Sequence, residues 1–361
     1  MERAHNEVTS YEISEVIPLP FVNLDLSNPS TIYTCLLYAA EQCKNQSHVM
    51  VTFDQPLFTK ATEMALAAAA ENPLSRVVVQ LGGFHLLLSF MGAVGYIMAG
   101  SGLEDLWETI YAKNSVPQMM SGKAYARAVR AHMLTHQAVG TVLLECSSID
   151  AALQEEISSC YVSLFDKTAT LQDIESSDSL NELTTLLEKK MEEAAATGRT
   201  AKLWVQYMHS VSIIKLFVLA ERSGDWKLHL YCVQRMLPFF HASGHLNYAR
   251  SAHVYLQEML KLDKEMNPED MDKFVNKGFF TVRRSNKFWS GIWTDLTIEQ
   301  VLMRDIKTTG GLTEGRGISA STIAKWVHSM PATSRIVGAV EAFSGVKGVT
   351  SEQHVELRES R

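Results

Sequence analysis

Two apolar runs separated by a helix-forming segment constrain the fold of this chain most strongly. The run Val49–Phe53 ends at Asp54, and a second run, Val77–Leu81, ends at a Gly-Gly-Phe-His turn. A run that is apolar at nearly every position is typical of a strand buried on both faces of a parallel sheet. The intervening Leu57–Ala70 is rich in Ala, Leu, Met, Lys and Glu, which are strong helix formers. The pattern predicts a strand, a helix and a second, parallel strand.

The carboxyl ends of these two strands carry the first candidate site residues, Asp54 and His85. In open α/β sheets, functional side chains gather at the carboxyl ends of the strands. Asp54 has an alternative role as the cap of the helix that follows it. The local pattern favours neither role over the other.

Length and composition define the general class of protein. With 361 residues, 46% of them hydrophobic, the chain can bury a large core and is expected to form two packed units. The polar and charged residues 1–16 do not resemble a secretory signal. The longest apolar run, Leu86–Ala99, is shorter than the roughly 20 residues of a bilayer span, so we expect a buried helix and no membrane partner. The five cysteines form no Cys-x-x-Cys pair, which favours a reducing intracellular compartment.

The net charge of −7 is unevenly distributed along the chain. Residues 145–200 hold twelve acidic and four basic residues, a net charge of −8. Residues 277–317 hold seven basic and four acidic residues, a net charge of +3. Any surface that faces phosphate groups is therefore expected in the later segment.

Most of the remaining sequence is predicted to be helical. The predicted helices are Ser30–Cys43, with Ser30 as a candidate cap, then Leu103–Tyr111, Ala124–Leu144 and a series of helices between Ile149 and Leu262. This last series is about the size of a domain.

Several histidines and one aspartate were considered as ligands and given simpler interpretations. His132 and His136, four residues apart, fit a polar helix face better than a metal site, because no third ligand is near. A set of four histidines lacks cysteine or carboxylate partners at zinc-site spacing. Its members are His229, His241, His245 and His253. Asp25 fits a turn in Asp-Leu-Ser-Asn-Pro better than a ligand.

The basic segment contains the second candidate acid, Glu299. Thr294 or Asp295 is expected to cap a helix that runs to about Lys307, with Glu299 one turn in. The nearby cations suit phosphate oxygens. They are Arg283, Arg284, Arg304, Lys307 and Arg316. The alternative is a solvated amphipathic helix that ends at Gly310-Gly311.

This order of elements resembles the ribonuclease-H-like catalytic domain of cut-and-paste DNA transposases, especially the hAT and P-element types. The resemblance implies that Asp54 is the second catalytic acid, His85 the histidine of a Cys/Asp-x-x-His motif, and Glu299 the third acid beyond a helical insertion. It further implies that Asp54 and Glu299 hold Mg²⁺, that the partner is DNA, and that the protein is nuclear. The segments TFDQPLF, LGGFHLLLSFMG, GKAYARA, GHLNYAR and DLTIEQVLMRDIKTTGGLTEGRG also resemble a multicopy, transposon-derived animal family.

Two departures from the transposase pattern point to a protein without catalytic activity. Gly82 stands where the motif has Cys or Asp, and the sequence before Asp54 is too short for the strand that carries the first acid together with the hairpin that follows it. Since two-metal phosphoryl transfer needs all its carboxylates, we expect an N-terminally truncated, inactive relic or a domesticated fragment that binds DNA weakly and without specificity. The alternative is a non-catalytic helical module for protein interaction.

The sequence thus predicts an α/β fold with a large all-α part, predominantly α overall, built on an incomplete ribonuclease-H-like parallel or mixed sheet. The expected divisions are a partial core at 1–145, a helical insertion at 146–275, a returning core segment at 276–330 and a flexible tail at 331–361. If the site is inherited, Asp54 and Glu299 should lie within about 4–8 Å of each other, with His85 nearby.

Overall fold

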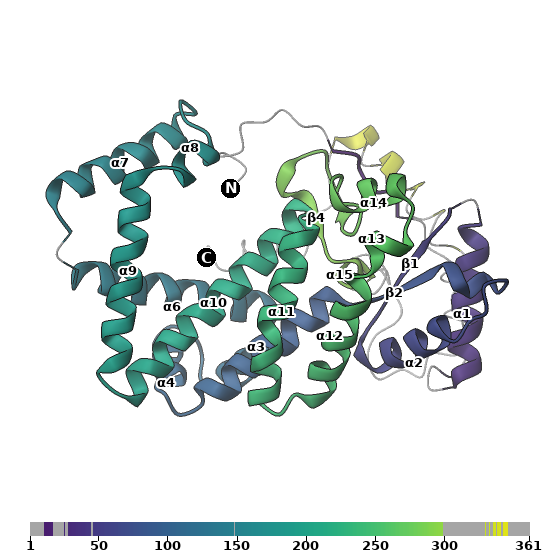
Figure 1. Ribbon diagram of the computed structural model, residues 1–361, viewed down its shortest axis with the longest axis horizontal. Helices are drawn as coiled ribbons and strands as arrows, with labels where there is room; N and C mark the ends of the chain where they lie inside the picture. Colours follow the sequence, from purple (N-terminus) through teal and green to yellow (C-terminus); the bar gives the residue numbers. More distant parts are fainter. Residues whose placement is uncertain are drawn as a thin grey trace. The chain divides into compact units, whose positions relative to one another are not determined.

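The computed structural model describes residues 11–16, 25, 28–44, 46–147 and 149–298, together with positions between 329 and 345. It divides into two units, one formed by Met1–Ser14 and Leu26–Glu299 and the other by Glu15–Asp25 and Gln300–Arg361. In the second unit, residues 338–340 and 342–344 are helical. The strands and helices labelled in Figure 1 all belong to the first unit.

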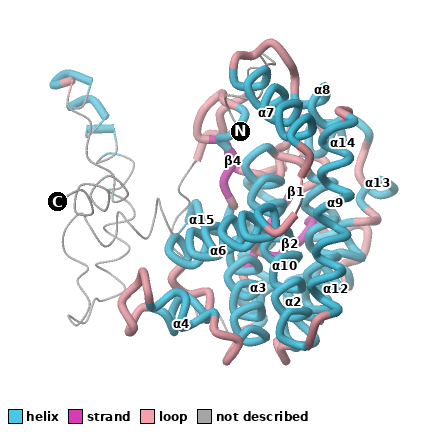
Figure 2. The backbone as a smooth tube through the Cα atoms, turned by 90° about the vertical axis from the view of Figure 1, so that its left-hand side faces the viewer, coloured by secondary structure: helices cyan, strands magenta, loops and turns pink. Residues whose placement is uncertain are grey.

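The predicted strand–helix–strand unit is confirmed. Strand β1 (Val49–Phe53) pairs in parallel with β2 (Val77–Leu81), and the register runs from Val49 opposite Val77 to Phe53 opposite Leu81. Helix α2 (Gln55–Leu66) and the short 3-10 helix η1 (Pro73–Arg76) connect the two strands. Within the described residues this sheet has two strands, so the fold as a whole is predominantly helical (Figure 2).

Helix α1 (Pro29–Gln42) precedes the sheet, as predicted, but its cap differs. The side chain of Asn28, not Ser30, accepts a hydrogen bond from the Ser30 backbone N–H. At the other end of α1, the guanidinium of Arg76 donates to the carbonyl groups of Ala40 and Cys43. This arginine fixes the end of α1 to the segment that leads into β2.

The central helices share one hydrophobic core. The apolar run predicted as a buried helix is α3 (Gly83–Met98), and it packs against α10 (Arg199–Ser223), α11 (Trp226–Ala242) and α12 (Leu246–Met259). The ring of Phe90 in α3 lies 5.5 and 6.0 Å from the rings of Phe239 and Phe240 in α11. Helices on both sides of the expected boundary at residue 145 therefore contribute to the same core.

One of these helices has the length and composition of a membrane span. Among the described residues, only α10 passes that test, and 44% of its apolar window is buried inside the protein. The same test is passed by core helices of globular proteins.

The other helices surround this core. They are α4 (Leu103–Glu108), α5 (Val116–Met120), α6 (Tyr125–Glu145), α7 (Ala151–Phe165), α8 (Leu171–Glu175), α9 (Asp178–Ala196), α13 (Leu262–Glu265) and α14 (Pro268–Val275). The polar face expected for the histidines of α6 is not what the structure shows. His132 is fully buried, with Nδ1 3.0 Å from the Tyr207 hydroxyl, and His136 Nε2 lies 3.2 Å from the Ser212 hydroxyl.

The chain finally returns to the sheet through a small hairpin. Strands β3 (Val282–Arg283) and β4 (Gly291–Ile292) pair in antiparallel fashion, with the 3-10 helix η2 (Phe288–Ser290) between them. Helix α15 (Thr294–Thr297) follows and contacts both β1 and α3. Thr294 Oγ1 lies 3.0 Å from Thr52 Oγ1 of β1.

Candidate functional site

Asp54 and His85 lie where the sequence predicts, at the carboxyl ends of the two parallel strands. Asp54 follows β1 and is the N-cap residue of α2, but its side chain makes no capping hydrogen bond and is exposed. His85 lies in the first turn of α3, directly after β2. Both residues therefore flank the edge at which α/β proteins carry their functional groups.

A third residue, Asp295, reaches the same edge from 210 positions further along the chain. One carboxylate oxygen accepts a hydrogen bond from the backbone N–H of Phe84 (3.1 Å), and the other from that of His85 (3.0 Å). His85 Nδ1 also lies 3.0 Å from Asp295 Oδ2. Asp295 itself is only 7% exposed, whereas the His85 side chain is 35% exposed, so the contacts with His85 are partly open to solvent.

Asp295 caps α3 in place of a local side chain. The N-cap residue of α3 is Gly82, which has no side chain to accept from the free N–H groups of the first turn. A carboxylate at this end also interacts favourably with the helix dipole. The sequence predicts that Thr294 or Asp295 caps its own helix, but the N-cap residue of α15 is Trp293, which makes no side-chain capping bond.

The glycine that departs from the Cys/Asp-x-x-His motif has a steric reason. A Cβ atom at position 82 would lie 2.5 Å from Asp295 Oδ2, which is closer than real Cβ contacts allow. Gly82 thus makes room for the carboxylate that caps the helix.

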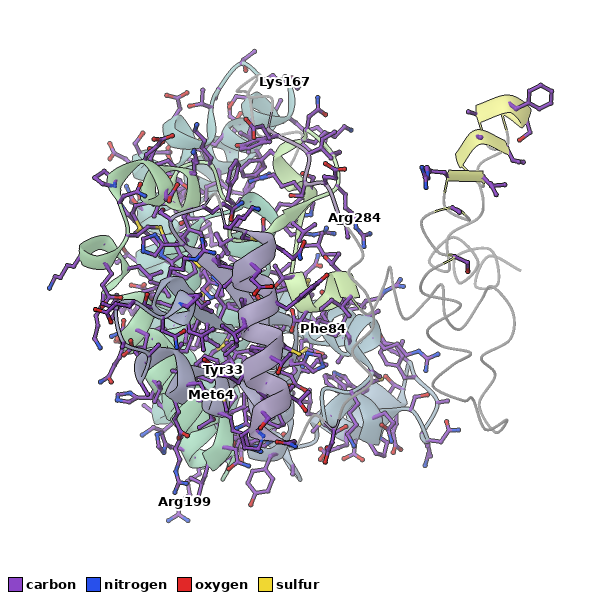
Figure 3. All side chains as sticks on the ribbon, turned by 90° about the vertical axis from the view of Figure 1, so that its right-hand side faces the viewer. Tyr33, Met64, Phe84, Lys167, Arg199 and Arg284 are labelled. Atoms are coloured by element: carbon purple, nitrogen blue, oxygen red, sulfur yellow. The ribbon has the colours of Figure 1, made fainter. Side chains whose placement is uncertain are left out.

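Of the remaining predicted site residues, some lie outside the described part of the chain and others are exposed or buried. Glu299, Arg304, Lys307 and Arg316 lie outside the described residues, so the expected approach of Glu299 to Asp54 stays a prediction. Arg284 is exposed, as its place in Figure 3 shows.

Arg283, by contrast, is only 2% exposed. Its guanidinium donates to the carbonyl groups of Ser223, Lys287 and Phe288. It also lies 4.0 Å from the centre of the Tyr11 ring. Burial lowers the pKa of Arg283. In this structure Arg283 binds protein groups rather than facing solvent.

A second polar cluster, which the sequence analysis did not find, lies behind this edge. His229 Nδ1 of α11 is 2.7 Å from Glu221 Oε1 of α10, and His229 Nε2 is 3.0 Å from the hydroxyl of Tyr255 in α12. All three side chains are buried. The indole of Trp226 stacks on the His229 ring, with 5.3 Å between centroids. The neighbours of His229 are one carboxylate, one phenol and aromatic rings, which do not make a zinc site of the kind weighed for the four histidines.

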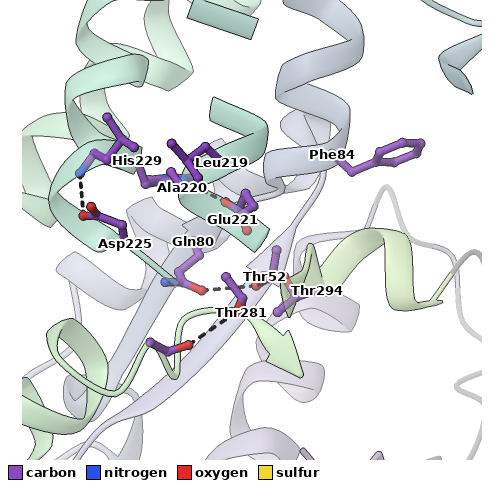
Figure 4. Close-up of polar contacts among 12 residues, drawn as sticks. Thr52, Gln80, Phe84, Leu219, Ala220, Glu221, Asp225, His229, Thr281 and Thr294 are labelled. Atoms are coloured by element: carbon purple, nitrogen blue, oxygen red, sulfur yellow. Dashed lines mark hydrogen bonds and ion pairs between the residues drawn. The ribbon is translucent and has the colours of Figure 1, made fainter. Parts of the chain in front are cut away.

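Thr52 of β1 and Gln80 of β2 extend this cluster to the sheet. Thr52 Oγ1 donates to Gln80 Oε1 at 3.4 Å, and Glu221 lies nearby in Figure 4. A buried Glu221 in a helix that otherwise shows an apolar stripe carries no local sequence signal. Only the three-dimensional packing places it here.

Carboxylates of the two clusters influence two nearby phenols, and Asp295 acts on both of them. Burial raises the pKa of Tyr248 to about 12, and the charges of Asp54 and Asp295 act in the same direction. Burial also raises the pKa of Tyr255, with further contributions from Glu221 and Asp295. For Glu221, burial raises the pKa, His229 lowers it and Asp295 raises it. Asp295 therefore contributes to the pKa shifts of Tyr248, Tyr255 and Glu221 alike.

The described residues do not form a metal site of the expected kind. They include no group of three His, Cys, Asp or Glu side chains that could hold an ion. Both carboxylate oxygens of Asp295 already accept hydrogen bonds from protein N–H groups, so this carboxylate does not fit the role of a Mg²⁺ ligand.

These features define a predominantly helical protein with a small parallel sheet, a capping carboxylate at the sheet edge and a buried Glu-His-Tyr cluster. The whole chain, residues 1–361, matches the family described as Domain of unknown function (DUF8702), and the chain belongs to that family. No curated protein and no solved structure gives a significant match.

Proposed function

We propose that this protein is a catalytically inactive descendant of a DNA transposase that retains part of a ribonuclease-H-like core. The parallel β1–β2 pair, with Asp54 and His85 at its carboxyl ends, supports the ancestry. The observation that carries the loss of activity is the engagement of Asp295. The carboxylate that meets His85 accepts hydrogen bonds from the backbone of Phe84 and His85, whereas two-metal chemistry needs carboxylates that bind cations about 4 Å apart.

A nuclease assay tests this proposal. The full chain is incubated with Mg²⁺ or Mn²⁺ and a labelled DNA duplex, beside the variants Asp54→Ala and Glu299→Ala. We expect no nicking or joining above the level of the buffer control. Metal-dependent nicking that disappears in both variants would contradict the proposal.

The same proposal predicts how the protein binds DNA. Duplex binding depends on cations that neutralise many phosphates, and this chain carries a net charge of −7. We expect weak binding that does not depend on sequence and is lost between about 50 and 200 mM salt. Fluorescence anisotropy with two unrelated duplexes measures this, and a clear preference for one duplex at the higher salt concentration would argue for a retained DNA function.

A helical interaction module remains the second candidate, and the α7–α9 segment favours it. None of the described residues of α9 is buried, and Tyr161 and Val162 on α7 are 57% and 58% exposed. The net charge of −8 over residues 145–200 suits a basic partner. In a selection against displayed basic amphipathic peptides, binding should be lost in Tyr161→Ser/Val162→Ser and kept in Tyr96→Ser, an exposed tyrosine on α3. Peptides that bind all variants equally would exclude this surface.

A further inference from the structure

A small cavity lies between the sheet and the buried cluster. Its volume is about 10 Å³, and its lining includes Thr52, Gln80, Glu221, Tyr255 and Trp293. Strands β1 and β2, helices α10 and α12, and the segment before α15 all contribute to it. The cavity therefore lies between elements that are up to 242 residues apart in the sequence.

The indole N–H of Trp293 has no acceptor here. Trp293 is only 3% exposed, and within the described part of the chain its Nε1 atom makes no hydrogen bond. Leaving a buried donor unpaired costs roughly 1–3 kcal/mol, so buried polar groups almost always have a partner.

The carboxylate of Glu221 is a strong acceptor in the lining of the same cavity. A Cβ atom built on Gly83 would lie 3.0 Å from Trp293 Nε1 and 3.2 Å from Glu221 Oε1. The indole donor and the carboxylate therefore both border the space beside this glycine, yet they do not bond to each other directly. Thr52 and Thr294 place two hydroxyl groups on the same cavity.

We propose that this cavity binds a single water molecule, which accepts a hydrogen bond from Trp293 Nε1 and donates one to the Glu221 carboxylate. A cavity that holds one water needs roughly 10–15 Å³ and two to four polar partners. The volume reaches that range, and the indole, the carboxylate and the threonine hydroxyls supply the partners. The chemistry selects a small neutral molecule that both donates and accepts.

The bound water joins two parts of the fold. Trp293 belongs to the segment that carries Asp295 to the edge of the sheet, and Glu221 belongs to the central helix α10. The water therefore links the returning segment to the helical core, in addition to the contact of Asp295 with α3. It also solvates a carboxylate that would otherwise have His229 as its main polar neighbour.

High-resolution crystallography of the full chain tests the site directly. We expect one ordered density peak within about 2.7–3.2 Å of Trp293 Nε1 and of a Glu221 oxygen. An NMR measurement of magnetisation transfer from water to the indole N–H protons should show a long-lived water beside Trp293. The matched control is Trp204, whose Nε1 donates to the backbone carbonyl of Ser101 and needs no water.

The variant Trp293→Phe removes the donor and keeps an aromatic ring. We expect loss of both the density peak and the water signal, while Trp204→Phe leaves the peak in place. Well-ordered density with no peak at the cavity would overturn the proposal, as would a direct bond from Trp293 to Glu221. If Trp293→Phe does not fold, the measurements on the unmodified chain decide the question alone.

Discussion

The carboxylate of Asp295 fills the space that any side chain at position 82 would need. The hypothetical Cβ of residue 82 lies 2.5 Å from Asp295 Oδ2, and the same carboxylate caps the helix that begins at Gly83. The glycine at position 82 and the capping carboxylate of Asp295 therefore depend on each other, although 213 residues separate them in the sequence.

This arrangement predicts that Gly82→Ala and Asp295→Ala are coupled. Gly82→Ala should lower the free energy of unfolding by about 1–3 kcal/mol through overpacking, and Asp295→Ala by a similar amount through loss of the cap. The double variant should lose clearly less than the sum, since the alanine at 82 no longer meets a carboxylate. Denaturant titration measures the free energy of unfolding of the two single variants and the double variant.

The control is Gly140→Ala in α6, where a Cβ meets no atom within 4 Å, and this variant should not be destabilised. Strictly additive losses would contradict the proposed contact.

A buried histidine and a half-buried histidine of α6 predict how stability depends on pH. Burial lowers the pKa of His132 to about 3, and burial together with the charge of Lys215 lowers that of His136 to about 4. Between these values and about 6.5 the unfolded chain binds more protons than the folded one, so the free energy of unfolding falls as the pH falls through this range.

The slope attributable to His132 approaches about 1.4 kcal/mol per pH unit, and His136 adds a contribution of the same sign. In urea titrations between pH 4 and 7, His132→Asn should flatten the pH dependence. His209→Asn, at an exposed position of α10, should leave it unchanged. Equal slopes for His132→Asn and the unmodified chain would show that His132 titrates normally in the folded state.

The Glu221 and His229 pair predicts an asymmetric response to mutation. His229→Leu leaves a buried carboxylate without its partner at 2.7 Å, which should cost about 3–5 kcal/mol at neutral pH. The loss should shrink as the pH falls, because Glu221 can take up a proton and become neutral. Tyr255→Phe removes only one hydrogen bond and should cost about 0.5–1.5 kcal/mol. The idea fails if His229→Leu costs less than Tyr255→Phe at pH 7.

Substitutions of the neighbouring residues Arg283 and Arg284 should have different effects on stability and on DNA binding. Arg283→Met should destabilise the protein by at least about 2 kcal/mol, because the buried guanidinium donates to carbonyl groups of three residues. Arg284→Met at the exposed position next to it should destabilise the protein less than Arg283→Met. Thermal unfolding and DNA anisotropy on both variants make the comparison. A folded Arg283→Met that binds DNA distinctly more weakly than Arg284→Met would assign Arg283 to a phosphate contact.

Local sequence patterns are sufficient to predict the strands and helices, but not the tertiary contacts between them. The parallel strands Val49–Phe53 and Val77–Leu81, and the buried helix after them, follow from runs of apolar residues that leave few alternatives. The capping of α3 by Asp295 cannot be predicted from such patterns. A carboxylate near the start of a helix is expected to cap that same helix. Only the return of the chain through β3 and β4 brings Asp295 to α3.

Burial of charged and polar side chains was likewise invisible in the sequence. Glu221 lies three residues before the glycine that ends α10, a position that is usually solvated, and His132 occupies a helix that also carries exposed arginines and glutamine. Their burial depends on neighbours from other helices, Tyr207, His229 and Tyr255, whose proximity no spacing rule encodes.

The contact between Asp295 and the start of α3 also sets an order of events during protein synthesis. Residues 83–85 leave the ribosome about 210 residues before the carboxylate that caps them. At the usual 5–20 residues per second, this interval lasts about 10–40 s. During that time α3, the most apolar of the described helices, has neither its cap nor the later helices α10–α12 that cover it. We therefore expect the nascent chain to expose this apolar helix to chaperones until the segment that carries Asp295 has been made.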